Sequence, residues 1–191
     1  MLEKTYQLIF LGSPLILVAI AHGVCIRYDL FSQLKRPLDL GMSFRERRIF
    51  GDHKTWRVLL LNMAFCTVGT IIQTWLQSKD YLPDWLFLLD YKKYGYLLGL
   101  LLGFGMTFGE LPNSFLKRQL GIPPGEKKRG FLGLIFFLFD QIDLTLGIWL
   151  FIFFLISPTL SLVLLSLPLT FVLHLTISSI GYLLGMRKTV L

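Results

Sequence analysis

Two aspartates inside an apolar stretch are the residues of this sequence best suited to chemistry. Asp140 and Asp143 lie within residues 136–144, Phe-Phe-Leu-Phe-Asp-Gln-Ile-Asp-Leu. A spacing of three places both carboxylates on one face of a helix, where they repel each other and are costly in lipid unless a cation neutralises them. We therefore predict that they hold a divalent metal ion, Mg²⁺, which bridges carboxylates to phosphates. The alternative is a structural pairing with a lysine or arginine from a loop.

A second polar cluster ends the third apolar stretch, in residues 109–118, Gly-Glu-Leu-Pro-Asn-Ser-Phe-Leu-Lys-Arg. It supplies one carboxylate, two small polar side chains and two adjacent cations, which are Glu110, Asn113, Ser114, Lys117 and Arg118. Lysine and arginine are common partners of phosphate oxygens, although this pair alone is also typical of a cytoplasmic helix anchor. The next residues, 121–125 (Gly-Ile-Pro-Pro-Gly), predict a turn that exposes backbone N–H groups to phosphate.

A third cluster, residues 51–57 (Gly-Asp-His-Lys-Thr-Trp-Arg), precedes the second apolar stretch. A glycine, a threonine and two cations near a helix start suit phosphate binding, with Lys54, Thr55 and Arg57 as the binding residues. The Gly-x4-Gly-Lys-Ser/Thr spacing of a Walker A loop is absent. The alternative for this segment is local, with Asp52 capping the helix.

Five apolar stretches must position these clusters. The chain has 191 residues, of which 54% are hydrophobic and 16% are charged, whereas soluble domains are about a quarter charged. A helix needs about 20 apolar residues to cross the hydrocarbon, and the stretches that qualify are residues 6–26, 58–76, 94–111, 131–156 and 159–185. We therefore predict an all-α integral membrane protein with about five transmembrane helices, in which residues 1–191 form a single domain.

Glycines mark the third stretch. Gly95, Gly99 and Gly103 recur at four-residue spacing and are followed by Gly105 and Gly109. This pattern is typical of a close-packed helix face in a membrane. The alternative is a backbone thinned so that a ligand can approach its cytoplasmic end.

Basic residues set the orientation of the helices. The loops after the first and third stretches and the C-terminus hold 15 of the 19 lysines and arginines, and Lys4, Lys79, Lys92 and Lys93 remain for the other side. The positive-inside rule then predicts an outer N-terminus, a cytoplasmic C-terminus and two basic cytoplasmic loops. We expect a multi-pass protein of the cell (plasma or inner) membrane. The net charge of +7 fits basic loops that face an anionic leaflet. The sequence contains no soluble basic domain, so we expect no nucleic-acid partner.

All three polar clusters fall at the same cytoplasmic level, which suits a nucleotide triphosphate and a lipid phosphate as substrates. Together with Pro37-Leu38-Asp39 and the segment 174–182, they resemble the CDP-archaeol synthase family, which is related to the phosphatidate cytidylyltransferases. The resemblance runs from about residue 37 to residue 188. It implies that CMP is transferred from CTP to a membrane lipid phosphate, giving a CDP-lipid and pyrophosphate, with Mg²⁺ as the cofactor.

The resemblance also implies residue roles. The implied catalytic residues are Asp140, Asp143, Lys117 and Arg118. The implied CTP-binding residues are Lys54, Thr55, Arg57, Glu110, Asn113 and Ser114. The implied metal ligands are Asp140, Asp143 and Glu110.

Three departures from the family pattern leave the lipid open. Glu110 stands where the family usually has aspartate, and Leu40 and Val58 replace usual glycines. An ester-linked phosphatidate and an unsaturated ether-linked lipid phosphate are therefore equal expectations. Two other readings are a CTP-dependent lipid kinase of the polyprenol type, which would transfer the γ-phosphate, and a non-catalytic membrane protein that binds lipid or nucleotide. The oligomeric state is not indicated.

Overall fold

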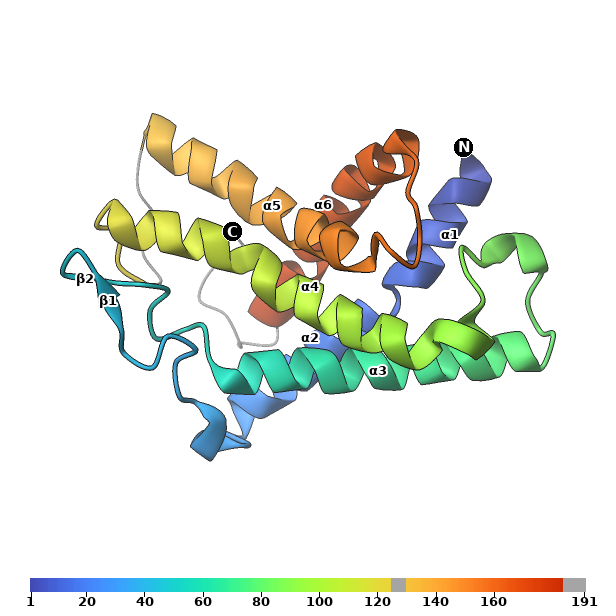
Figure 1. Ribbon diagram of the computed structural model, residues 1–191, viewed down its shortest axis with the longest axis horizontal. Helices are drawn as coiled ribbons and strands as arrows, with labels where there is room; N and C mark the ends of the chain where they lie inside the picture. The colour runs from blue at the N-terminus through green and yellow to red at the C-terminus, as the bar shows by residue number, and fades with distance from the viewer. Residues whose placement is uncertain (125–129, 184–191) are drawn as a thin grey trace.

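The computed structural model describes residues 1–124 and 130–183, and helices make up most of it (Figure 1). The helices are α1 (Leu2–Gly12), α2 (Pro14–Arg27), α3 (Trp56–Ser78), α4 (Tyr91–Gln119), α5 (Phe131–Ile152) and α6 (Leu160–Leu183). The loops add two short 3-10 turns, η1 (Ser32–Leu34) and η2 (Asp84–Leu86), and a hairpin of β1 (Ser43–Phe44) and β2 (Arg47–Arg48). Some residues of the predicted cytoplasmic segments lie outside the described residues. They are Gly125 of the predicted turn and the basic residues Lys127, Lys128, Arg129, Arg187 and Lys188.

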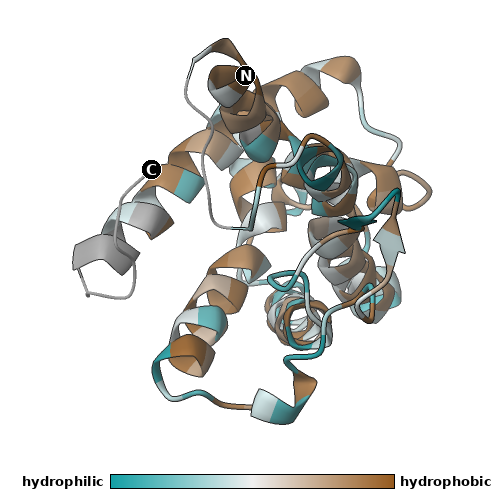
Figure 2. Ribbon diagram, turned by 90° about the vertical axis from the view of Figure 1, so that its left-hand side faces the viewer, coloured by the Kyte–Doolittle hydropathy of each residue, from teal (hydrophilic) through white to brown (hydrophobic). Residues whose placement is uncertain are grey.

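The predicted class of fold, an all-α integral membrane protein, is confirmed. Four segments in the described part of the chain are long and apolar enough to cross a membrane, and these are Leu2–Arg27, Trp56–Ser78, Phe131–Ile152 and Leu160–Ile177. The fifth long helix, α4, has 29 residues and packs lengthwise between α3 and α5. Figure 2 shows hydrophobic residues along most of each helix and hydrophilic residues on the hairpin and neighbouring loops.

The first predicted helix is broken in two. Pro14 has no backbone N–H to donate to the Phe10 carbonyl, so the hydrogen-bond ladder of the helix is interrupted there. The Phe10 carbonyl accepts instead from the N–H of Ser13 at 3.1 Å, from the Ser13 Oγ at 2.9 Å and from the Gln73 Nε2 of α3, which also donates to the Ser13 Oγ at 3.0 Å. Pro14 fits against α3 at Gly69, where an added Cβ would lie 2.6 Å from the Pro14 Cβ. The break is therefore built into the packing of α1 and α2 on α3.

Helix α4 continues beyond its predicted end at residue 111. It runs through Pro112 to Gln119, so the second polar cluster lies on a helix and not in a loop. Beyond the helix, the N–H of Gly121 donates to the Arg118 carbonyl at 3.0 Å, and the N–H of Ile122 donates to the Lys117 carbonyl at 2.9 Å. These two N–H groups cap the helix, so the prediction that they face phosphate is wrong.

The glycines of α4 form two packing faces. Gly99 and Gly103 meet the backbone of α3, and Gly105 and Gly109 meet the backbone of α5. A Cβ added to Gly109 would lie 2.5 Å from the carbonyl oxygen of Asp143, which no real contact permits. The predicted close-packed face is therefore confirmed, and neighbouring helices fill the space that a ligand would need.

The two ends of the molecule differ in the loops that they carry. The N-terminus and the α3–α4 and α5–α6 connections lie toward one end, and the hairpin, η1 and the start of α5 lie toward the other (Figure 1). Side chains tie the first end together: Lys4 Nζ donates to the Ser161 Oγ at 2.8 Å, and Gln7 Nε2 donates to the Trp85 carbonyl at 2.6 Å. The hairpin end is the one that the sequence predicts to be cytoplasmic.

Candidate active site

One amide joins the two aspartates of α5 to α4. The Nδ2 of Asn113 donates to the Asp140 Oδ1 at 2.6 Å and to the Asp143 Oδ2 at 2.8 Å. Asn113 is 5% exposed, and its Oδ1 is buried without a hydrogen-bond partner. The short side chain of Asn113 spans this gap because Gly109 and Gly147, one turn away, bring the two helix backbones into contact.

Two lysines neutralise two of the three carboxylates at this level. Lys117 Nζ pairs with the Asp140 Oδ1, and Lys54 Nζ pairs with the Glu110 Oε2. Within the described residues, Asp143 has no ion-pair partner. The site therefore holds one more negative than positive charge. The Asp140 side chain is 45% exposed, which leaves this carboxylate open to a ligand.

The donor atoms of this group suit a hard cation. Carboxylate and amide oxygens are ligands that Mg²⁺ accepts, and Asp140, Asp143 and the orphaned Oδ1 of Asn113 supply them. Glu110 faces Lys54, and no group of three or more histidine, cysteine or acidic side chains in the described part of the chain is close enough to hold a metal ion. The structure thus brings Asp140 and Asp143 together, and their metal-binding role stays a prediction.

A buried carboxylate organises the loop that carries Lys54. Asp39 is 1% exposed and accepts hydrogen bonds from Arg48 Nη2 at 2.7 Å and from the backbone N–H groups of Phe50 at 2.9 Å, Gly51 at 3.1 Å and Gly41 at 3.1 Å. Burial raises the pKa of Asp39, but these four donors outweigh burial and lower the pKa to about 2. Asp39 is therefore ionised at neutral pH, and the loop closes around its charge.

Backbone pairing extends this order to the start of α3. The N–H of Leu38 donates to the Lys54 carbonyl at 2.7 Å, and the N–H of Trp56 donates to the Arg36 carbonyl at 3.0 Å. Thr55 caps α3 by accepting from the N–H of Val58 at 3.4 Å. The alternative that Asp52 caps this helix is wrong, because Asp52 pairs with Arg48 at 2.8 Å.

The predicted site residues separate into two sets. The first set has six residues: Asn113, Lys117, Asp140 and Asp143 are joined across the α4–α5 interface, and the Lys54–Glu110 pair lies one turn along α4. Arg57 instead donates to the Leu30 carbonyl at 3.1 Å and lies 3.5 Å from Asp29. Arg118 donates to the Ile122 carbonyl and lies beside Gly51. Ser114 is buried on α4, and the hydroxyl of Thr55 serves as a helix cap.

A series of hydrogen-bonded polar side chains connects three of the helices and was not predicted from the sequence. His22 Nε2 lies 2.8 Å from the Asn62 Oδ1, and the Asn62 Nδ2 donates to the Thr107 Oγ1 at 3.0 Å. Because the amide nitrogen of Asn62 is directed at Thr107, His22 must be the donor to Asn62 and carries its proton on Nε2. The series joins α2, α3 and α4 one turn from Glu110. Its only signal in the sequence is an isolated polar residue in each apolar stretch.

Comparison with protein families gives one match that covers nearly the whole chain. The model of the CarS-like family, described as CDP-archaeol synthase, matches residues 6–191. Similar proteins include a CDP-archaeol synthase of Methanosarcina barkeri, 33% identical over 167 residues, which cover 80% of this chain and 89% of that protein. A CDP-archaeol synthase of Pyrococcus furiosus is 40% identical over 91 residues, which cover 47% of this chain and 48% of that protein.

A solved structure shares the fold. It is described as an intramembrane enzyme for archaeal membrane lipid biosynthesis and superposes with a TM-score of 0.61 at 23% identity. The superposition covers 88% of this chain and 90% of the other. At this identity the similarity supports the helical membrane architecture.

Proposed function

The chain belongs to the CDP-archaeol synthase family, and we propose that it transfers CMP from CTP to a membrane lipid phosphate. An oxygen of the lipid phosphate forms a bond to the α-phosphorus of CTP, and the bond from that phosphorus to the pyrophosphate oxygen breaks. The products are a CDP-lipid and pyrophosphate. The observation that carries this proposal is the group of Asn113, Lys117, Asp140 and Asp143 joined across α4 and α5, with the Lys54–Glu110 pair one turn along α4.

We propose that the lipid phosphate substrate has ether-linked chains of the archaeol type. The support is the set of relatives named CDP-archaeol synthases, which match most of this chain. The ester-linked, diacylglycerol type remains the competing substrate. Matched ether and ester lipid phosphates with identical chains distinguish them, and we expect a higher kcat/KM for the ether.

The residues of the site have separate roles in this proposal. Lys54 and Lys117 exchange Glu110 and Asp140 for the phosphates of CTP, because the triphosphate carries several negative charges whereas each carboxylate carries one. Asp140 and Asp143 would hold Mg²⁺, with Glu110 as a further ligand once Lys54 has moved. A bound Mg²⁺ neutralises charge that develops on the phosphoryl oxygens. No protein nucleophile is needed, so positioning and charge neutralisation account for the rate.

The two sets of predicted residues refine the proposal. Arg57 and Arg118 are held by carbonyl groups away from the carboxylates, so their proposed contacts with CTP require rearrangement of the loops. Lys54 and Lys117 already lie at the carboxylates. We therefore give the two lysines the larger share of phosphate binding.

The proposed orientation places this site toward the cytoplasm, where CTP is available. The protein is a multi-pass membrane protein, and we propose an outer N-terminus, a cytoplasmic C-terminus and one functional domain over residues 1–191. The support is the predicted bias of basic residues toward the hairpin end. Labelling a single cysteine introduced at Ser78 with an impermeant reagent tests it, since the reagent should reach that position from outside.

The position of the label in CTP tests the reaction. We expect label in the α-phosphate to enter the lipid and label in the γ-phosphate to leave as pyrophosphate. Transfer of the γ-label to the lipid would instead establish a lipid kinase. Transfer of neither label, by monodisperse protein that binds CTP, would indicate a binding protein without catalysis. An Asp140→Asn, Asp143→Asn double variant is the matched control for background transfer.

A further inference from the structure

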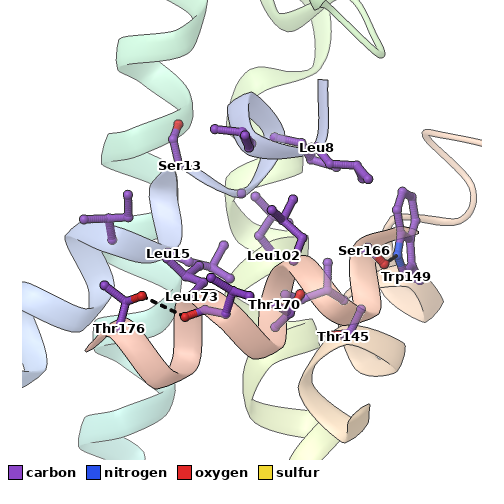
Figure 3. A pocket seen from close by; sticks show the side chains of 17 residues that line it. Leu8, Ser13, Leu15, Leu102, Thr145, Trp149, Ser166, Thr170, Leu173 and Thr176 are labelled. Carbon is purple, nitrogen blue, oxygen red and sulfur yellow. Dashed lines mark hydrogen bonds between the residues drawn. The ribbon is translucent and has the colours of Figure 1, made fainter. Parts of the chain in front are cut away.

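A cavity of about 240 Å³ lies among α1, α2, α4, α5 and α6, inside the apolar part of the molecule (Figure 3). Leucine and isoleucine side chains form most of its wall, including Leu102 of α4, Ile148 of α5 and Leu169 of α6. No lysine, arginine, aspartate or glutamate lines it. CTP therefore has no charge partner here, and the cavity is a site separate from the carboxylates.

The break between α1 and α2 forms one side of the cavity. Gly12, Ser13 and Leu15 all line it, and a Cβ added to Gly12 would meet no atom within 4 Å. Ser13 keeps helical backbone angles (φ −58°, ψ −32°), so the break is a kink at Pro14 and not a stretch of irregular backbone. The kink therefore packs closely on α3 at Pro14 and borders this internal space at Gly12.

One hydroxyl group in the wall has no partner. Thr145 of α5 is 3% exposed, and its Oγ1 makes no hydrogen bond. The nearby Ser166 Oγ, in contrast, accepts from Trp149 Nε1 at 2.9 Å and donates to the Val163 carbonyl at 2.6 Å. Of the cavity-lining side chains in the described part of the chain, Thr145 alone has such an orphaned buried polar atom. A buried hydroxyl without a partner is costly, so it suits a ligand that brings an oxygen.

From these observations we infer that the cavity binds one hydrocarbon chain of the lipid phosphate substrate. Thr145 donates to the ether or ester oxygen at the start of that chain. Thr145 follows Asp143 by two residues, which is about 3 Å along the axis of α5. Because residues two apart leave a helix on different faces, the lipid passes beside α5 between the carboxylates and the cavity. Sites for whole drug-sized ligands begin at about 300 Å³, and this smaller cavity holds part of one chain. The inference rests on the proposed function.

A photoreactive substrate tests the location directly. The probe is a lipid phosphate with a diazirine in one chain, bound to the full-length protein in nanodiscs and located by mass spectrometry after illumination. We expect labelling of cavity residues such as Leu169 and Leu173, competed by unlabelled lipid phosphate and not by bulk phospholipid. Labelling confined to the lipid-facing Leu150 and Leu164, or equal competition by bulk phospholipid, would overturn the inference.

Filling the cavity tests its part in substrate recognition. Leu169→Trp should raise the KM for a long-chain lipid phosphate at least about tenfold, the effect of excluding a few methylene groups from an apolar site. The KM for CTP and for a short-chain analogue should not change. Leu164→Trp is the matched control, because Leu164 lies on the same helix, is 56% exposed and does not line the cavity. Equal KM values for the long-chain substrate in both variants would contradict the inference.

The hydroxyl is tested by Thr145→Val, which keeps the shape of the side chain. We expect a several-fold higher KM for the ether or ester substrate and no change for an analogue with a methylene group in place of the linkage oxygen. Equal effects on both substrates would exclude this hydrogen bond. If the wild-type protein makes no CDP-lipid, the proposed function fails, whereas the photolabelling result still reports whether the cavity holds a chain.

Discussion

The α4–α5 interface and the space between α1 and α6 lie in the same molecule and are packed in opposite ways. At the α4–α5 interface, glycines leave no room for a single Cβ, and Asn113 holds both aspartates. In the space between α1 and α6, the helical segment is interrupted at Ser13-Pro14, and a cavity lies beside this interruption. A close interface fixes side chains to within a fraction of an ångström, which phosphoryl chemistry needs. An open apolar space accepts a flexible hydrocarbon chain, whose atoms do not react and therefore need no exact position.

Loss of either aspartate at the close interface should have the largest effect. Asp140→Asn and Asp143→Asn should each lower kcat about 100-fold or more, because each removes a charge that the proposed metal needs. The measurement is CDP-lipid formation by protein shown to be monodisperse. Asp84→Asn, in the exposed loop at the other end, is the control and should keep its rate. Near-normal rates in both aspartate variants would place the chemistry elsewhere.

Adding a side chain at two glycines separates the two regions most clearly. Gly109→Val should destabilise the protein by about 3 kcal/mol, because its side chain meets the Asp143 carbonyl and the structure must shift. Gly12→Val should leave stability unchanged, since its Cβ meets open space, and should raise only the KM for a long-chain lipid. Thermal unfolding in detergent measures the first effect. Equal melting temperatures in the two variants would remove the contrast in packing.

The buried carboxylate of the loop between α2 and α3, Asp39, should contribute less, and its contribution should depend on pH. Asp39→Asn should cost about 2 kcal/mol at neutral pH, the equivalent of its lowered pKa. A group whose folded pKa is depressed stabilises the fold above its unfolded pKa. The advantage of wild type over Asp39→Asn should therefore be full above pH 3.8 and disappear as the pH falls toward about 2. An advantage that does not change over this range would show that the charge is not the cause.

Removal of one lysine should have the smallest effect of the set. Lys117→Ala should weaken CTP binding about tenfold, the value of one charge-assisted contact to phosphate. Lys79→Ala, at the other end of the molecule, is the matched control. Isothermal titration calorimetry measures the affinity of both variants for CTP. Unchanged affinity in Lys117→Ala would return this lysine to a structural role as the partner of Asp140.

Periodicity in the sequence predicted the parts of the site that depend on one helix. The shared helix face of Asp140 and Asp143 and the packing face of the α4 glycines could be predicted from residue spacing alone. The roles of Asp39 and Arg57 were not predictable in this way, because they depend on loop backbone that folds across ten or more residues. The cavity depends on how α6 packs beside a broken helix, and only the proline at position 14 hinted at that break. Side-chain partners between helices therefore needed the structure.

Metal binding by the two aspartates is the most direct test of the proposed chemistry. Mn²⁺ is a paramagnetic substitute for Mg²⁺, and electron paramagnetic resonance reports its binding without turnover. With CTP present, wild type and Asp84→Asn should bind Mn²⁺, whereas Asp140→Asn and Asp143→Asn should bind it far more weakly. Mn²⁺ binding by both aspartate variants at wild-type affinity would contradict the account, because the α4–α5 interface would then position carboxylates that hold no metal.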